Sequence, residues 1–458
     1  MSRFTAGVSV SFLLVYLLWA GWLSQYPIQI TSDDALNFSR AIERFSVLEF
    51  RPHFPGYPAF VGMSRFVALW SSPDLANVML SLMAAIALPM LVFGLIVQLS
   101  GSWQAACLGG LLVLIQPLMA SVALSGLSDS LAMVFLLLAL MSGFRQKHAL
   151  AGLCIGLMLA TRPSYFPLAL GCMVIPLLNG NKGSKLRAYV QASFNLIIVG
   201  LLSLAFIWSK DGSGYFVEGI RFTQGHFSTW GNTAAGDNSG VVQWLDTLTQ
   251  TYGIVGIGLM MVCIFFGLSE LRPSRINRLD IERQGAIALI NATYLIWVLV
   301  AQNPDNLRHW TPVVVLFAVL LPLQVQAYLY HGQRRKVSSV FSVACLVYFA
   351  AVGGMKSNFE HTQSPTQQAI TWIKQHPEIK VVGTNYSVNL LREQLNNRAV
   401  YDMYYPSSQL ALLSRQQAAF RLSGSRLNDQ QLITQFPARF SGERQLYLYK
   451  ASNNTGRK

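Results

Sequence analysis

Long apolar stretches separated by short polar connections constrain this sequence more than any other feature. A helix needs about 20 apolar residues to cross the hydrocarbon core of a bilayer, and stretches near that length recur along the chain. Only 12% of the residues are charged, against roughly 25% in an ordinary soluble domain. The sequence therefore predicts a polytopic α-helical membrane protein with about eleven transmembrane helices. The predicted spans are residues 6–24, 75–99, 104–123, 128–143, 149–161, 164–178, 188–208, 251–268, 286–301, 311–330 and 338–354.

Basic residues mark alternate connections between these stretches. With a cytoplasmic N-terminus, every cytoplasmic connection except the short turn at Gly101 is basic, as the positive-inside bias requires. Membrane orientation thus explains the net charge of +14, and we expect no nucleic acid partner. The sequence predicts a multi-pass protein of the cell inner (plasma) membrane whose first span, 6–24, is not cleaved. The basic residues concerned are Arg3, Arg145, Lys147, Lys182, Lys185, Arg187, Arg272, Arg275, Arg278, Arg283, Arg334, Arg335 and Lys336.

From residue 355 onward the chain becomes polar and alternates between helix-like and strand-like segments. We expect residues 1–354 to form a transmembrane catalytic domain and residues 355–458 to form a small periplasmic α/β domain. The five cysteines all fall in apolar stretches, so neither a disulfide framework nor a zinc site is expected. The expected helices are 365–376, 387–395 and 429–436, and the expected strands are 380–383, 399–401 and 445–449.

Two adjacent carboxylates follow the first apolar stretch. Asp33 and Asp34 open an amphipathic segment that we expect to lie at the membrane interface. In one interpretation Ser32 or Asp33 caps this helix, which is worth about 0.5–2 kcal/mol. In the other the pair supplies a general base, because neighbouring negative charge and partial burial raise the pKa of a carboxylate.

The motif Arg51-Pro52-His53-Phe54-Pro55-Gly56-Tyr57-Pro58 opens the next apolar stretch. Three prolines and a glycine restrict the backbone sharply, so the motif is typical of a rigid turn back into the membrane. Arg51 and His53 could in addition meet an anionic group at the interface, since the arginine fork suits phosphate.

Three other connections on the outer side carry candidate residues. Asp129 precedes a span, where it could cap a helix. Arg162 lies at the outer end of a span, where the positive-inside bias disfavours cations, so it should pair with a carboxylate or a phosphate. Arg308 and His309 lie in the short connection 302–310, where Arg308 could also simply extend its charge to the interface.

The connection 209–250 is long for a membrane protein, and long ordered loops tend to bind ligands. His226, Trp230 and Asn232 could line a sugar site there. A tryptophan that anchors the chain at the membrane interface is the alternative.

An acidic pair after the first span, an amphipathic helix and then His-Phe-Pro-Gly-Tyr-Pro together resemble the GT-C class of polyprenyl-phosphate-sugar-dependent glycosyltransferases. The pattern is similar to bacterial members akin to the protein mannosyltransferases and the aminoarabinose transferase of lipid A. The resemblance implies a lipid-linked sugar donor, a glycan, lipid or protein acceptor, and contact with membrane lipid. It also implies inversion at the anomeric centre, with Asp33 as general base and Asp34 as its support, an order that could be reversed.

The resemblance and the residue types together define a candidate site. Asp33 and Asp34 are the catalytic candidates. The donor phosphate candidates are Arg51, His53, Arg162 and Arg308, because fixed cations stabilise charge on a leaving phosphate. The sugar or acceptor candidates are Tyr57, Asp129, His226, Trp230, Asn232 and His309. Asp33, Asp34 and Asp129 could also hold Mg²⁺ or Mn²⁺, since hard cations favour carboxylate oxygens.

Two other functions fit parts of the sequence. An O-antigen polymerase or ligase also acts on lipid-linked sugars, but such proteins tend to use arginines in large loops instead of an acidic pair. A transporter usually places ionisable residues near the bilayer midplane and often has repeated halves. The sequence contains little charge within its spans and no evident repeat.

Overall fold

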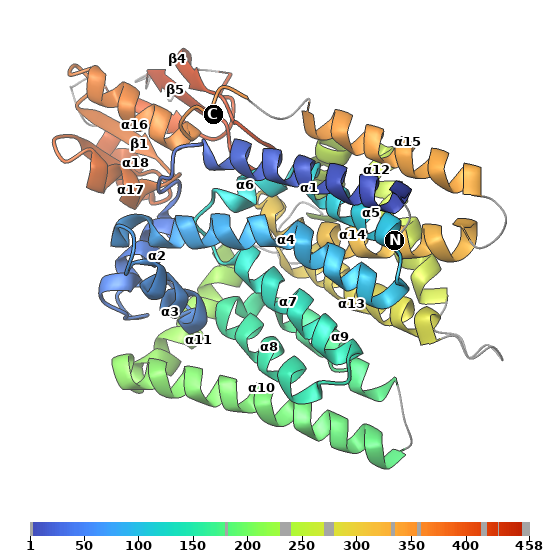
Figure 1. Cartoon of the computed structure of the whole chain (residues 1–458). Helices are drawn as coiled ribbons and strands as arrows, with labels where there is room; N and C mark the ends of the chain where they lie inside the picture. Colours follow the sequence, from blue (N-terminus) through green and yellow to red (C-terminus); the bar gives the residue numbers. More distant parts are fainter. Residues whose placement is uncertain are drawn as a thin grey trace.

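The computed structural model describes residues 3–178, 182–229, 240–269, 279–330, 335–354, 359–413, 419–428 and 430–450. Most of these residues are helical, and a small sheet lies near the C-terminus. Figure 1 shows that the C-terminal helices and strands gather at one end of the helical bundle, the end that also holds α2 and α3.

The helices before the C-terminal part follow the apolar pattern of the sequence. They are α1 (Arg3–Ser24), α2 (Asp33–Glu43), α3 (Pro58–Val67), α4 (Ala76–Ser100), α5 (Trp103–Leu114), α6 (Met119–Ala123), α7 (Asp129–Phe144), α8 (His148–Thr161), α9 (Phe166–Cys172), α10 (Lys182–Asp211), α11 (Gly214–Thr229), α12 (Gly240–Ser269), α13 (Leu279–Ala301), α14 (Thr311–Gln324) and α15 (Arg335–Gly354). Short turns of tighter or wider helix accompany them: η1 (Pro73–Leu75), η2 (Pro163–Tyr165), η3 (Ile175–Leu177), η4 (Leu307–Trp310) and η5 (Val325–Tyr330).

Every predicted span contains helix, but the helices differ in length. Among the described residues, 6 helical stretches are long and apolar enough to cross a membrane. The predicted span 104–123 is divided into α5 and α6, because Pro117 cannot donate a backbone hydrogen bond in a continuous helix. The six stretches are Pro73–Ser100, Gly183–Asp211, Gly240–Ser269, Glu282–Ala301, Leu307–Ala327 and Lys336–Gly354. The total of about eleven crossings remains a prediction.

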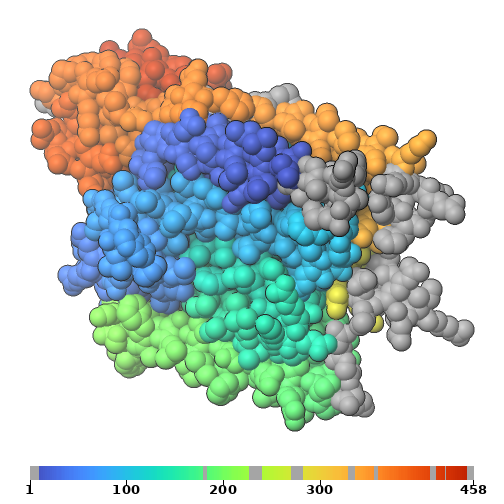
Figure 2. Space-filling model, viewed as in Figure 1, coloured from blue at the N-terminus to red at the C-terminus, as the bar shows by residue number. Residues whose placement is uncertain are grey.

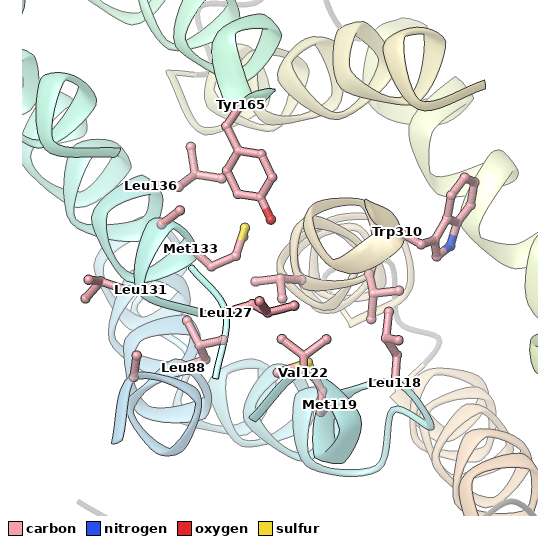
Figure 3. Packing of buried hydrophobic residues seen from close by; sticks show 14 of the residues in the cluster. Leu88, Leu118, Met119, Val122, Leu127, Leu131, Met133, Leu136, Tyr165 and Trp310 are labelled. Carbon is pink, nitrogen blue, oxygen red and sulfur yellow. The ribbon is translucent and has the colours of Figure 1, made fainter. Parts of the chain in front are cut away.

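The apolar side chains separate a buried core from a surface suited to lipid. All residues from Val313 to Leu320 in α14 are fully buried, which is expected of a helix that is apolar on every side. On α10 and α15, by contrast, Leu202 and Val340 are 65% and 70% exposed. Figure 3 shows part of the core, with Tyr165, Met133 and Val122 around the helix that follows Trp310.

Small residues let neighbouring helices approach closely. A Cβ atom at Gly152 of α8 would lie 2.0 Å from the backbone oxygen of Ala192 in α10, and one at Gly156 would lie 2.7 Å from the side chain of Val199. Helices in membranes associate through such close packing. The end of α8, which carries Arg162, is therefore held firmly against α10.

The C-terminal part, which comprises the described residues from 359 to 450, contains a five-stranded sheet of order β2-β1-β3-β5-β4. Strand β1 pairs in parallel with β2 and β3, and β5 pairs antiparallel with β3 and β4. The strands are β1 (Val381–Thr384), β2 (Ala399–Asp402), β3 (Ala419–Ser423), β4 (Gln431–Phe436) and β5 (Leu446–Lys450), and the helices are α16 (Pro365–Gln375), α17 (Val388–Gln394) and α18 (Pro406–Leu413).

Most of the predicted C-terminal elements are present. Strands β1, β2 and β5 and helices α16 and α17 lie at the predicted positions. The helix predicted at 429–436 is wrong, because Gln431–Phe436 forms β4 and pairs with β5. Strand β3 was not predicted.

Arg439 joins the C-terminal part to the end of α1. Its side chain is 1% exposed and donates two hydrogen bonds to Glu443, from Nε and Nη2, as well as one to the carbonyl of Thr362. The guanidinium also lies over the rings of Tyr26 and Phe440. Figure 2 shows the C-terminal part seated against the N-terminal segment.

Replacing Arg439 by Met should loosen this junction. The change leaves the carboxylate of Glu443, 13% exposed, without its cation, and breaking a buried pair costs about 3–5 kcal/mol. We expect a lower unfolding temperature of the purified protein and faster proteolysis of the C-terminal part. Arg426→Met is the matched control, since Arg426 is exposed. Equal stability of the two variants would contradict the prediction.

Candidate active site

The start of α2 sets the direction of the acidic pair. Ser32 is the N-cap of α2, and its hydroxyl accepts a hydrogen bond from the backbone N–H of Ala35 at 3.2 Å. Asp33 and Asp34 occupy the first turn, where negative charge is favoured by the helix dipole. Because Ser32 supplies the cap, both aspartate side chains are available for other partners.

Asp34 lies between two residues from distant parts of the sequence. Its Oδ2 accepts a hydrogen bond from Arg308 Nη2 at 3.1 Å, and its Oδ1 lies 3.7 Å from His53 Nδ1. The Asp34 side chain is 39% exposed and that of Arg308 is 22% exposed. Burial raises the pKa of Asp34, but the charges of His53 and Arg308 outweigh it and bring the pKa below its ordinary value.

Asp33 faces a different partner, the C-terminal part. Its Oδ1 accepts from the backbone N–H of Leu390 at 2.9 Å and its Oδ2 from that of Asn389 at 3.2 Å. Burial raises the pKa of Asp33 above its ordinary value, and the charge of Asp34 acts in the same direction. The two backbone hydrogen bonds and Arg40 partly oppose this rise.

A second ion pair lies beneath this surface. Arg162 Nε is 3.1 Å from Asp129 Oδ1, and the side chains are 6% and 1% exposed. Arg162 also donates to Ser128 Oγ at 3.3 Å, and Tyr165 donates to Asp129 Oδ1 at 3.4 Å. Asp129 therefore does more than begin α7, because its carboxylate binds the end of α8.

Several contacts unite the two ion pairs into one site. Arg162 Nη2 lies 3.3 Å from His309 Nδ1, and His309 is the neighbour of Arg308. The hydroxyl of Tyr57 lies 3.1 Å from His53 Nε2. Burial raises the pKa of Tyr57 to about 12, and charges from both ion pairs act on it.

Asn77 of α4 holds this site together from below. Its buried Nδ2 donates to the carbonyl oxygens of Ala35 at 3.0 Å and Gly126 at 2.9 Å. The first turn of α2 is thereby fixed beside the connection that leads into α7. Asn77 was not predicted as a site residue, although an amide within an apolar stretch is a recognisable signal.

The structure brings together seven of the predicted residues, from the first outer connection and from 128–129, 162 and 308–309. They are Asp34, His53, Tyr57, Asp129, Arg162, Arg308 and His309. Asp33 lies next to them and contacts α17.

The other candidates are not placed in this cluster. Arg51 has its ion pair with Glu49, at 3.9 Å. His226 belongs to α11 (Gly214–Thr229), but its side chain lies outside the described residues, as do Trp230 and Asn232 entirely. A cavity of about 730 Å³ opens at the other end of α2, beside Glu43, Arg65 and Lys210, and none of the predicted site residues lines it.

The proposed metal ligands do not converge. Among the described residues, no group of three or more His, Cys, Asp or Glu side chains is placed to hold a metal ion. Asp33, Asp34 and Asp129 face α17, Arg308 and Arg162 respectively. This set of three carboxylates therefore does not fit a metal centre.

Two tyrosines and the C-terminal part contribute to the site without having been predicted. Tyr165 contacts Asp129, and Tyr294 donates to the carbonyl of His309 at 3.1 Å. Tyr386 lies under the guanidinium of Arg444. Burial raises the pKa of Tyr386, and the charges of Arg444 and Arg308 oppose this rise. Only Tyr165 had a usable signal, because it follows Arg162 by three residues, and its backbone N–H donates to the carbonyl of Arg162 at 3.0 Å.

The fold is similar to that of other solved proteins. One is ArnT from Cupriavidus metallidurans bound to undecaprenyl phosphate, with a TM-score of 0.55, 11% sequence identity and 99% of each chain covered. Another is the oligosaccharyltransferase AglB from Archaeoglobus fulgidus, in complex with an inhibitory peptide and a dolichol-phosphate. Its TM-score is 0.50 at 10% identity, over 92% of this chain and 70% of AglB.

The resemblance predicted from the sequence is thus confirmed as a likeness of fold. In comparisons of sequence, no protein-family model and no curated protein matches this chain.

Removing one member of the buried ion pair should destabilise the protein. Arg162→Met leaves Asp129 buried without its cation, and we expect a loss of about 3–5 kcal/mol. The double variant Asp129→Leu/Arg162→Met should recover much of this loss, because both charges are then absent. Denaturant unfolding of the purified protein measures the difference.

The matched control is Arg221→Met. Arg221 pairs with Glu218, but the two side chains are 71% and 52% exposed, so we expect a change of only about 0–1 kcal/mol. If Arg162→Met were as stable as this control, the buried pair would not be structural.

Proposed function

We propose that the chain is a membrane glycosyltransferase that moves a sugar from a polyprenyl-phosphate donor to an acceptor hydroxyl at the periplasmic face. The observation that carries the proposal is the ion pair between Asp34 and Arg308, with 3.1 Å between Asp34 Oδ2 and Arg308 Nη2. It joins one carboxylate of the acidic pair to an arginine, a residue type that suits phosphate. The GT-C type of fold supports it. ArnT and AglB were solved with undecaprenyl phosphate and with a dolichol-phosphate, so a lipid-linked donor is part of the proposal.

The cations are proposed to bind the donor phosphate. Arg308 is partly exposed and its partner Asp34 is accessible, so a phosphate can take over some of its hydrogen bonds. Charge-assisted bonds from arginine to phosphate stabilise the negative charge that develops on the leaving group. Arg162 lies behind His309 and adds positive charge from a buried position.

The acceptor oxygen then attacks the anomeric carbon of the sugar. As the new carbon–oxygen bond forms, the bond from the anomeric carbon to the phosphate oxygen breaks, and polyprenyl phosphate leaves with the electron pair. The hydroxyl proton passes to a carboxylate of the acidic pair. A single direct displacement inverts the anomeric centre.

The two carboxylates are proposed to have different tasks. Asp34 contacts Arg308 and His53, so it belongs to the donor side. Asp33 faces away from these cations and has a raised pKa, which suits a general base. A nucleophile must approach opposite the leaving group, and Asp33 is therefore assigned to the acceptor side.

The orientation of the chain is part of the proposal. The residues of the site and the C-terminal part share one end of the bundle (Figure 1). We place this end in the periplasm and the N-terminus in the cytoplasm, since the basic connections follow the positive-inside bias. The acceptor class, whether glycan, lipid or protein, stays open.

Substituting the two aspartates tests the function. Asp33→Asn should lower the rate of sugar transfer by about 10²- to 10⁴-fold, the usual contribution of a general base, while binding of polyprenyl phosphate persists. Asp34→Asn should weaken transfer and alter donor binding, because it releases Arg308. Asp74→Asn, at an exposed position, is the control. Full transfer by both Asp33→Asn and Asp34→Asn would defeat the assignment and favour an O-antigen polymerase or ligase.

The pH dependence of transfer tests the base separately. Transfer requires ionised Asp33, so activity should fall as the pH drops through the raised pKa of Asp33. Arg40 lowers that pKa, and Arg40→Gln should therefore move the acid limb of the kcat/KM profile to higher pH. A shift to lower pH in Arg40→Gln would be incompatible with Asp33 as the base.

A further inference from the structure

Asp33 supplies the N-terminal cap of α17, which has no side-chain cap of its own. The N-cap residue of α17, Ser387, has a left-handed backbone with φ of 51° and makes no side-chain hydrogen bond to the helix. The backbone N–H groups of Asn389 and Leu390 are satisfied instead by the two oxygens of Asp33. A residue of α2 thus completes a helix of the C-terminal part across 357 positions of sequence.

This contact occupies the carboxylate that the proposed function needs. A general base must lie about 2.6–3.2 Å from the oxygen whose proton it accepts. Both oxygens of Asp33 already accept hydrogen bonds at 2.9 and 3.2 Å. Each carboxylate oxygen can accept a second hydrogen bond, but the first turn of α17 lies against Asp33 and takes up the space that an acceptor molecule needs beside it.

We infer that the acceptor binds between α2 and α17, and that its hydroxyl replaces the backbone N–H groups of α17 at Asp33 when α17 moves away. We call this place the α2–α17 junction, made by Asp33, Arg40, Asn389, Leu390 and Glu393. The inference rests on the proposed function. It adds an acceptor subsite and a conformational step to it.

The exposed ion pair at the α2–α17 junction favours its opening. The side chains of α2 and α17 also form the ion pair of Arg40 with Glu393, which are 37% and 48% exposed, and exposed pairs are weak. The C-terminal part is held much more firmly elsewhere, where Phe440 packs on Trp22 and Tyr26 and Arg439 is buried. The proposed movement separates α17 from α2 and uncovers Leu390, which is 1% exposed, while Arg439 and the aromatic cluster keep their contacts.

Polar and aromatic residues lie next to the N-terminus of α17. Tyr386 immediately precedes the cap of α17, and its ring lies 5.5 Å from the guanidinium carbon of Arg444. Arg444 in turn pairs with Asp305 at 3.2 Å, in the connection that carries Arg308. Tyr386 and Arg444 thus lie between α17 and the connection that carries Arg308.

Linking the junction shut tests the inference. All five natural cysteines are buried, so the double variant Arg40→Cys/Glu393→Cys can be joined selectively with a short cleavable bismaleimide. We expect the linked full-length protein to bind radiolabelled polyprenyl phosphate normally but to lose sugar transfer, and cleavage of the linker to restore it. The matched control is Gln435→Cys/Gln445→Cys, a pair in contact within the sheet, whose linkage should leave transfer unchanged.

Full transfer by the linked junction variant, or a joint loss of donor binding and transfer, would overturn the inference. Absence of transfer by the unlinked wild-type protein would instead defeat the proposed function.

A charge reversal tests the same step without a linker. Glu393→Lys places two cations together and should favour the open junction, lowering the apparent KM for the acceptor by about two- to five-fold, the change that one exposed ion pair can supply. The affinity for polyprenyl phosphate should stay constant. The double variant Arg40→Glu/Glu393→Lys should return the KM to the wild-type value, and a raised KM in Glu393→Lys would speak against an opening step.

Discussion

The buried ion pair of Asp129 and Arg162 is the interaction on which the rest of the site depends. Removing two charges from water costs several kcal/mol per ion, and the pair is tolerated only where other groups complete its hydrogen bonds. Ser128, Tyr165 and His309 supply part of those contacts, and Asp129 Oδ2 has no hydrogen-bond partner among the described residues. The start of α7, the end of α8 and the connection before α14 must therefore meet, and this meeting brings Arg308 within reach of Asp34.

The membrane explains why so much of this site could be predicted from the sequence. Polar groups are expensive inside the bilayer, so the apolar stretches reveal where the polar connections lie. Asp34, Asp129, Arg162 and Arg308 were found in this way, and the structure gathers them at one end of the bundle. Their mutual pairing could not be read, because Asp34 and Arg308 are 274 positions apart and the packing of α14 decides which connections face each other.

Three features of the structure differ from the sequence-based predictions or were missing from them, and each has a physical reason. Gln431–Phe436 contains glutamines that suit a helix, but it pairs antiparallel with β5, with Phe436 opposite Leu446, and this pairing makes it a strand. Arg51 follows Glu49 closely enough for a local ion pair, which competes with any partner across the site. Tyr294 lies within an apolar helix, where an aromatic side chain looks like core, and only the carbonyl of His309 reveals its polar contact.

The acidic pair shows how helix geometry gives two neighbouring residues separate environments. Adjacent positions on a helix do not face the same way, so Asp34 points to Arg308 while Asp33 points to α17. The pKa of Asp34 is lowered by its cations, whereas burial raises that of Asp33. The proposed displacement would use this division, because the nucleophile approaches the anomeric carbon on the side opposite to the departing phosphate. In the proposed reaction α17 lies on the acceptor side at Asp33, and the C-terminal part also reaches the connection that carries Arg308, through the ion pair of Arg444 with Asp305.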